Sequence, residues 1–129
     1  MSLHPAYFTT RFRVAQAPPE WPSAFIIVTA YATTGERWTE EENARADEAL
    51  RTRVSQTAVW HWPVTGYDPT TGHAEPGWAI GLDRDDGVRL GIEFRQDAIF
   101  CVTDDELEVV SCRTGEVSRV GAFRIRLGE

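Results

Sequence analysis

The chain has 129 residues, of which 42% are hydrophobic and 26% charged, the size and composition of one globular domain with a buried core. It is lysine-free, so all 13 basic residues are arginine. This excludes enzymes that need a Schiff-base lysine or the lysine of a phosphate-binding P-loop. The chain is acidic, and its net charge of −7 argues against general nucleic-acid binding.

No apolar run approaches the roughly 20 residues of a membrane-spanning helix, and residues 1–20 lack the apolar core of a signal peptide. We therefore expect a cytoplasmic protein with no membrane partner. Cys101 and Cys112 are too few for a disulfide scaffold and lack the spacing of a metal or redox motif. We expect both thiols to be reduced.

The first third of the chain predicts two strands. Residues 1–6 are expected to be a flexible start, and Phe8–Val14 alternates apolar and polar side chains, as a half-buried strand does. Three prolines within Ala17–Pro22 then impose a loop. Ala24–Ala30 is β-branched and apolar on both faces, which indicates a central strand covered on both sides.

A loop over Tyr31–Trp38 leads into the clearest helix of the chain, expected over residues 39–56. Thr39 is a typical N-cap, and Glu42 three residues later completes a capping box. An apolar stripe with helical spacing follows.

Two further strands are expected in the middle of the chain. Ala58–Val64 is one of them, ended by Pro63, and a polar loop over Thr65–Ala74 follows it. A corner at Glu75-Pro76-Gly77 then opens a buried strand over Trp78–Leu82.

The segment Asp83–Phe94 supports two interpretations. Its alternating pattern and the Asp86-Gly87 turn signal predict a strand, whereas Asp83 as an N-cap and the apolar pair Leu90 and Phe94 predict a helix.

Beyond it, strands are expected over Ala98–Val102 and Leu107–Ser111, and Val117–Leu127 provides one or two more. Turns at Asp104-Asp105 and Thr114-Gly115 separate them.

Several short motifs follow one another along the chain: Phe25–Ala30, Glu41-Glu42-Asn43 with Leu50, Gly66, Glu75-Pro76 and Phe94–Ile99. The series resembles a family of uncharacterised bacterial proteins, domain-of-unknown-function family 3293, over roughly residues 7–112. The chain departs from the family pattern after Tyr31, where Ala32 and Thr33 replace Asn and Pro, and at Gly77, where the family often has Ser. Since similar sequences look helical before Gln96, the resemblance implies a helix over residues 83–94. No activity comes with it.

The fold class expected is therefore α+β. We expect a single domain over residues 1–129 with a mixed or mostly antiparallel sheet of five to seven strands. The helix over residues 39–56 lies on one face, and the segment 83–94 forms a second helix.

Polar residues at the ends of the predicted strands and at the start of the helix form the candidate site, because α/β architectures gather ligands there. They are Thr29, Tyr31, Asn43, Glu75 and Gln96. We predict that they line one polar pocket. The alternative is a set of hydrogen bonds that only stabilises the fold.

His73 and Glu75 are two residues apart and could act as an acid–base pair, although a solvated polar loop explains them better. Asp83 could add a third metal ligand, but the spacing matches no known metal motif, so we expect no metal and no cofactor.

No catalytic residue can be assigned, and we expect a non-catalytic binding or regulatory domain that recognises a small molecule or a protein partner. One alternative is a small hydrolase or transferase using Glu75 with His73. Another is a nucleic-acid-associated protein with an arginine face formed by Arg11, Arg13, Arg124 and Arg126.

Overall fold

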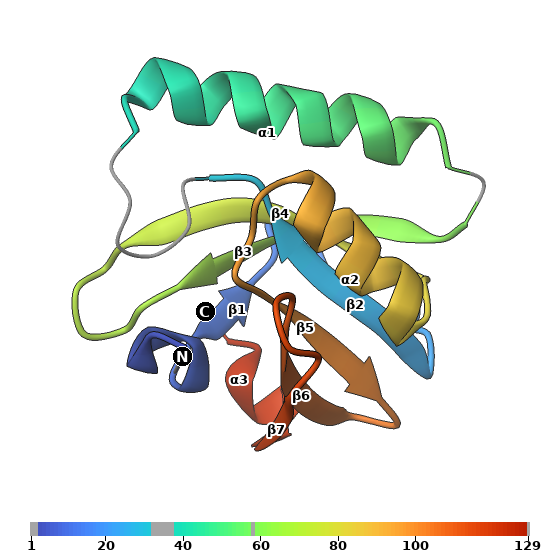
Figure 1. Ribbon diagram of the computed structural model, residues 1–129. Helices are drawn as coiled ribbons and strands as arrows, with labels where there is room; N and C mark the ends of the chain where they lie inside the picture. Colours follow the sequence, from blue (N-terminus) through green and yellow to red (C-terminus); the bar gives the residue numbers. More distant parts are fainter. Residues whose placement is uncertain (1–2, 32–37, 58, 129) are drawn as a thin grey trace.

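The computed structural model describes residues 3–31, 38–57 and 59–128. The chain forms a single α+β domain in which a curled seven-stranded sheet carries two main helices on one face (Figure 1). The strands are β1 Arg11–Arg13, β2 Ala24–Thr29, β3 His61–Tyr67, β4 Ala74–Ile80, β5 Ala98–Thr103, β6 Glu106–Ser111 and β7 Val117–Ala122. The helices are η1 Pro5–Phe8, a 3-10 helix, α1 Glu40–Ser55, α2 Arg84–Glu93 and α3 Phe123–Arg126.

The sheet has the order β1-β3-β4-β2-β5-β6-β7, and every neighbouring pair is antiparallel. It curls into a half-barrel, and the segment after α3 returns to its first edge, where Phe12 of β1 forms a parallel bridge with Leu127. The Gly128 amide also donates to the Phe12 carbonyl at 2.9 Å. The expected α+β class and mostly antiparallel sheet are confirmed.

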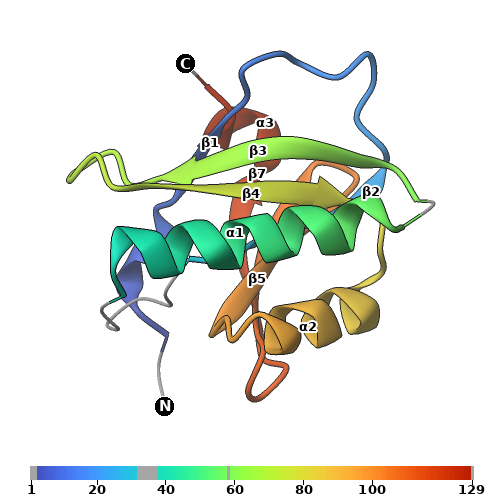
Figure 2. The same cartoon turned by 90° about the horizontal axis from the view of Figure 1, so that it is seen from above.

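The central strand β2 separates two apolar clusters. Its alternate residues Phe25 and Ile27 belong to one cluster, and Ile26 and Val28 belong to the other. Helix α1 contacts β4, and α2 contacts β2 and β5, so both helices cover the second cluster (Figure 2). This confirms the expectation that Ala24–Ala30 forms a central strand covered on both sides.

The capping box of α1 is confirmed. The Glu42 amide donates to Thr39 Oγ1 at 3.0 Å, and the Thr39 amide donates to Glu42 Oε1 at 2.9 Å. The helix ends at Ser55, within one residue of the predicted boundary. Residues 32–37 of the expected preceding loop lie outside the described residues.

The helix implied for residues 83–94 is confirmed as α2, and the strand interpretation is wrong. Asp83 is the N-cap, and its side chain accepts from the Asp86 amide at 2.8 Å. A Cβ atom at Gly87 would lie 2.8 Å from Ile26 Cγ2, and one at Gly91 would lie 2.7 Å from Cys112 Sγ. The glycines therefore let the helix lie close to the sheet, and Gly87 does not mark a hairpin turn.

Two expectations about β3 and β4 are wrong. Strand β3 runs through Pro63 to Tyr67, which is possible because β1 pairs only with Thr65–Tyr67 and leaves Pro63 at an edge. Position 58, where this strand was expected to begin, lies outside the described residues. Glu75-Pro76-Gly77 is no corner but belongs to β4, since a hairpin through residues 68–73 joins the two strands.

The ends of the chain also differ from expectation. His4 caps η1, so helical structure begins inside the segment expected to be flexible, and residues 1–2 lie outside the described residues. The first strand is shorter than expected, because only Arg11–Arg13 pair with β3. Of the one or two strands expected over Val117–Leu127, the structure has one, β7, and Phe123–Arg126 form a helical turn instead of a second.

A turn and two buried thiols expected from the sequence are confirmed in the described residues. Asp104 and Asp105, with φ of 48° and 69°, form the turn between β5 and β6. Cys101 and Cys112 are buried free thiols, as expected. None of the helices in the described segments is long and apolar enough to cross a membrane.

Candidate functional site

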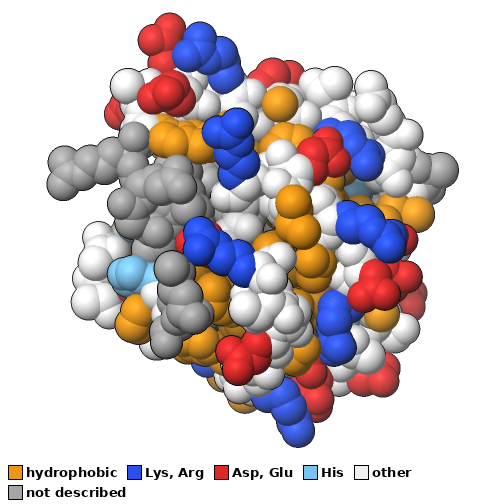
Figure 3. Space-filling view, viewed as in Figure 1, with side chains coloured by type: hydrophobic (Ala, Val, Ile, Leu, Met, Phe, Trp, Pro, Cys, Tyr) orange, Lys and Arg blue, Asp and Glu red, His pale blue; other side chains and the backbone are white. Residues whose placement is uncertain are grey.

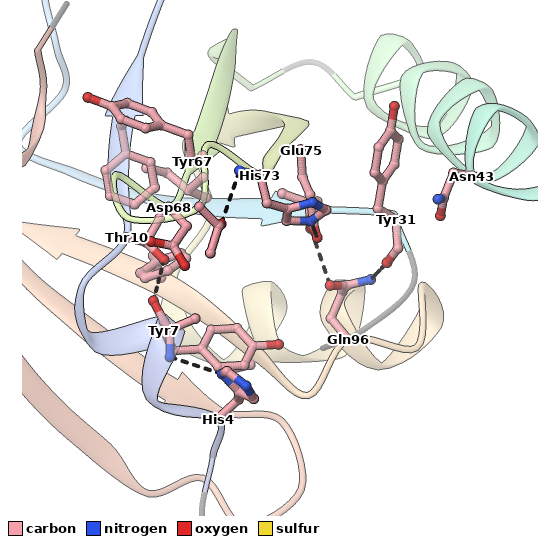
Figure 4. A pocket seen from close by; sticks show the side chains of 18 of the residues that line it. His4, Tyr7, Thr10, Tyr31, Asn43, Tyr67, Asp68, His73, Glu75 and Gln96 are labelled. Atoms are coloured by element: carbon pink, nitrogen blue, oxygen red, sulfur yellow. Dashed lines mark hydrogen bonds and ion pairs between the residues drawn. The ribbon is translucent and has the colours of Figure 1, made fainter. Parts of the chain in front are cut away.

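A pocket of about 560 Å³ opens where η1, the end of β2 and the starts of β4 and β5 meet the first turn of α1 (Figure 4). Its lining includes all five residues predicted for a polar pocket, namely Thr29, Tyr31, Asn43, Glu75 and Gln96. His73 also lines it. The structure therefore brings the candidate residues together from four separate segments of the chain.

The pairing of β2 with β4 places Thr29 and Glu75 side by side. Thr29 lies opposite Gly77, and Glu75 is two residues away from Gly77, so the two side chains share one face of the sheet. Their oxygens Oγ1 and Oε1 are 3.0 Å apart. A Cβ atom at Gly77 would lie 2.9 Å from Thr29 Cγ2 and 2.5 Å from the Val28 carbonyl oxygen, so this contact needs a glycine opposite Thr29.

The second carboxylate oxygen of Glu75 is held from the β3–β4 hairpin. His73 Nε2 lies 2.9 Å from Glu75 Oε2, and the hairpin is closed by the Asp68 amide, which donates to the His73 carbonyl at 2.8 Å. The Glu75 side chain is 21% exposed and that of His73 66% exposed. The carboxylate is thus fixed at both oxygens while one side still faces the pocket.

Gln96 is 7% exposed and connects the pocket to the segment after β2. Its Nε2 donates to the carbonyl oxygens of Tyr31 at 2.8 Å and Phe94 at 3.1 Å, and its Oε1 lies 3.2 Å from Thr29 Oγ1. Both amide hydrogens are therefore used inside the protein. Gln96 fixes the wall of the pocket and holds the Tyr31 backbone in place.

Within the described part of this network, hydrogen-bond acceptors exceed donors at its centre. The Thr29 hydroxyl has a single hydrogen but lies within reach of two acceptors, Glu75 Oε1 and Gln96 Oε1. It can satisfy only one of them fully at a time. A hydrogen-bond donor brought by a ligand would remove this imbalance.

Tyr31 and Asn43 form the side of the pocket nearest α1 (Figure 4). The pKa of Tyr31 is raised above its usual 10.0 by burial and, less strongly, by the negative charges of Asp47, Glu75 and Glu40. Three carboxylates therefore place negative charge near this wall of the pocket.

The sequence did not reveal the contribution of the N-terminal segment. His4, Tyr7 and Thr10 line the side of the pocket opposite α1, although residues 1–6 were expected to be flexible. The proline that begins η1 and the aromatic Tyr7 were the only signals available. Phe12 and Phe100, whose rings pack edge to face at 5.0 Å, supply an apolar floor.

The three residues considered above as metal ligands do not come together in the pocket. Asp83 caps α2 and is absent from the pocket lining, so it cannot join His73 and Glu75 there. Across the described ranges, no three histidine, cysteine or acidic side chains are placed to hold a metal ion.

The arginine face proposed for nucleic acid is occupied by intramolecular contacts. Arg11 donates to the Ile125 carbonyl, Arg126 donates to the carbonyls of Thr10 and Val120, and Arg124 pairs with Asp105. Arg13 lies over the Tyr67 ring. On the molecular face that carries α1 and α2, basic and acidic side chains are interspersed (Figure 3). These four arginines therefore fasten the C-terminal segment and the sheet edge.

Comparison with known families gives one match. Residues 28–99 match the family described as "Protein of unknown function (DUF3293)", a range that runs from the last two residues of β2 through α1, β3, β4 and α2. The match includes every one of the five predicted pocket residues. No curated protein and no solved structure matches the chain.

Proposed function

The chain belongs to the DUF3293 family of proteins of unknown function, and we propose that it is a non-catalytic binding domain that takes a small ligand in the pocket around Glu75. One observation carries this proposal: a carboxylate held at both oxygens still faces a pocket of about 560 Å³. Pockets of this size, with an apolar floor and a few fixed polar groups, are typical small-molecule sites. A cytoplasmic location, expected from the sequence, is part of the same proposal.

The chemistry of the described lining favours binding over catalysis. It contains no serine or cysteine, and the Thr10 hydroxyl donates to the Ala6 carbonyl at 2.7 Å. The Thr29 hydroxyl faces Glu75 and Gln96. A nucleophile needs an adjacent base that can take its proton and room to reach a substrate, and neither Thr10 nor Thr29 has both. The third threonine of the lining, Thr71, accepts a hydrogen bond from the His73 amide at 3.2 Å.

A second candidate is a small hydrolase or transferase that uses Glu75 with His73. The 2.9 Å contact between them favours it, because a carboxylate that orients a histidine is a common arrangement for a general base. Its nucleophile would be water. His73→Gln separates the two candidates. In an enzyme it should abolish turnover, because glutamine cannot act as the base. In a binding domain it should leave ligand binding intact, because the glutamine amide can still donate to Glu75.

A fragment screen by two-dimensional amide NMR tests the proposal on the intact protein. A mixed set of cationic, neutral and anionic fragments at about 1 mM covers the weak affinities expected for such compounds. We expect at least one class to shift the amides of residues 29, 75 and 96 together. Glu75→Gln should weaken this binding while the spectrum stays folded.

Glu116→Gln is the matched control. Glu116 is exposed and lies outside the pocket lining, so its replacement removes the same charge elsewhere and should leave fragment binding unchanged. The proposal is wrong if no fragment shifts the pocket amides and Glu75→Gln only lowers the unfolding midpoint. The network would then be purely structural.

A further inference from the structure

The described lining of the pocket contains acidic side chains but no arginine, although the chain is rich in arginine. The chain has 13 arginines, yet none belongs to the described residues of the pocket lining. Two carboxylates, Glu75 and Asp68, do belong to it. Anion-binding sites in proteins rely on arginine, lysine or helix N-termini. The N-terminus of α1 lies beside the pocket, but Thr39 caps it and three glutamates occupy its first turn, so the described lining is poorly suited to a phosphate or a carboxylate.

The hydrogen-bonding groups around Glu75 favour a ligand that donates. Among the described residues, three acceptor atoms, Glu75 Oε1, Glu75 Oε2 and Gln96 Oε1, receive hydrogen bonds from the single Thr29 hydrogen and from His73 Nε2. Because both Nε2 hydrogens of Gln96 are already bonded, its amide cannot supply a further donor. A ligand ammonium group has three donors and no acceptor, which complements this shortage.

Aromatic side chains contribute to the pocket lining. Tyr31 lies on the side of α1 and Tyr7 on the opposite side (Figure 4), and Trp38, which precedes the N-cap of α1, also belongs to the lining. Cations bind to the faces of such rings, and the protein already makes one contact of this kind, with the Arg13 guanidinium 5.0 Å from the centre of the Tyr67 ring. Burial raises the pKa of Tyr31, and the negative charges of Asp47, Glu75 and Glu40 raise it further.

We propose that the ligand of this pocket is a small organic cation, an amine or guanidine with an apolar body. Its charged group contacts Glu75 between the aromatic side chains, and its apolar body lies on the floor formed by Phe12 and Phe100. This inference rests on the proposed binding function and specifies the chemical class of the ligand.

A series of three probes that share one ring and differ in charge tests the inference. Phenethylamine is cationic at about pH 7, phenylethanol is neutral and phenylacetate is anionic. Each is titrated into the intact protein and followed by the amide signals of the pocket residues. We expect phenethylamine to bind with a Kd about tenfold lower than that of either partner.

Two variants locate the source of this preference. Glu75→Gln should abolish the advantage of phenethylamine over phenylethanol, whereas Glu116→Gln should preserve it, since it changes the net charge equally but lies outside the lining. A preference lost equally in both variants would reflect general attraction to an acidic protein and would overturn the inference.

The outcomes also separate this inference from the proposed function. If phenylacetate or phenylethanol binds the pocket as tightly as phenethylamine, the binding function stands and the cation is the wrong class. The same holds if all three fail while other fragments of the screen bind there. If neither the series nor the screen shifts the pocket amides, both proposals fail.

Discussion

The Thr29 hydroxyl lies 3.0 Å from the Glu75 carboxylate, although 46 residues separate them in the sequence. The contact exists because β2 and β4 pair with Thr29 opposite Gly77, which places Glu75 diagonally across the two strands. Register between two strands, rather than a local motif, therefore positions the carboxylate of the candidate site.

Gly77→Ala should disturb this register. The added Cβ would lie 2.5 Å from the Val28 carbonyl oxygen, a backbone atom that cannot move without displacing β2. We expect a loss of about 1–3 kcal/mol in the free energy of unfolding, measured by chemical denaturation.

Gly66→Ala is the matched control on the neighbouring strand. A Cβ there would meet Thr10 Cγ2 at 3.5 Å, an ordinary van der Waals contact, so we expect a much smaller effect. Equal losses of unfolding free energy in the two variants would show that the close approach at Gly77 does not cause the destabilisation.

The α1 capping box gives a second prediction. Thr39→Ala removes the hydroxyl that accepts from the Glu42 amide, and we expect the unfolding free energy to fall by about 1 kcal/mol. Thr52→Ala, at an exposed position inside the same helix, should change it little or raise it by a few tenths of a kcal/mol. A denaturation midpoint unchanged by Thr39→Ala would contradict the capping role.

The buried thiols give a prediction about pH. Burial raises the pKa of both Cys101 and Cys112 from 9.0 to about 11. The unfolded chain loses these protons near pH 9 while the folded chain keeps them, so the unfolding free energy should fall as the pH rises from about 9 to about 11. Below that range the two thiols contribute no pH dependence.

The double variant Cys101→Ala/Cys112→Ala should show a shallower fall over the same pH range than the parent protein, because the two thiols no longer contribute. The native protein should also react slowly with a thiol reagent near neutral pH, where thiolates are scarce. Fast stoichiometric labelling of the folded protein would contradict the burial of at least one thiol.

The sequence predicted best what depends on local chemistry. The capping box set the start of α1, and the apolar runs located β2 and β5. It was less informative wherever tertiary packing decides. Gly87 looks like a turn residue in the sequence, but it lies inside α2 because the helix needs a small residue against Ile26.

The same distinction applies to the candidate site. Thr29, Glu75 and Gln96 were identifiable because each lies beside a strongly apolar run. His4 and Tyr7 were not, because nothing local links them to residues 73–75, and only the folded sheet brings η1 to that edge. The 2.9 Å contact between His73 and Glu75 exists because Glu75 belongs to β4. The sequence interpretation had placed Glu75 in a corner instead.

A crystal structure of the protein with phenethylamine bound tests the central claim most directly. We predict that the ammonium nitrogen lies within about 3 Å of a Glu75 carboxylate oxygen, the usual hydrogen-bond distance, with the phenyl ring against Phe12 and Phe100. An empty pocket at saturating amine, or an amine bound with its nitrogen directed away from Glu75, would contradict the account.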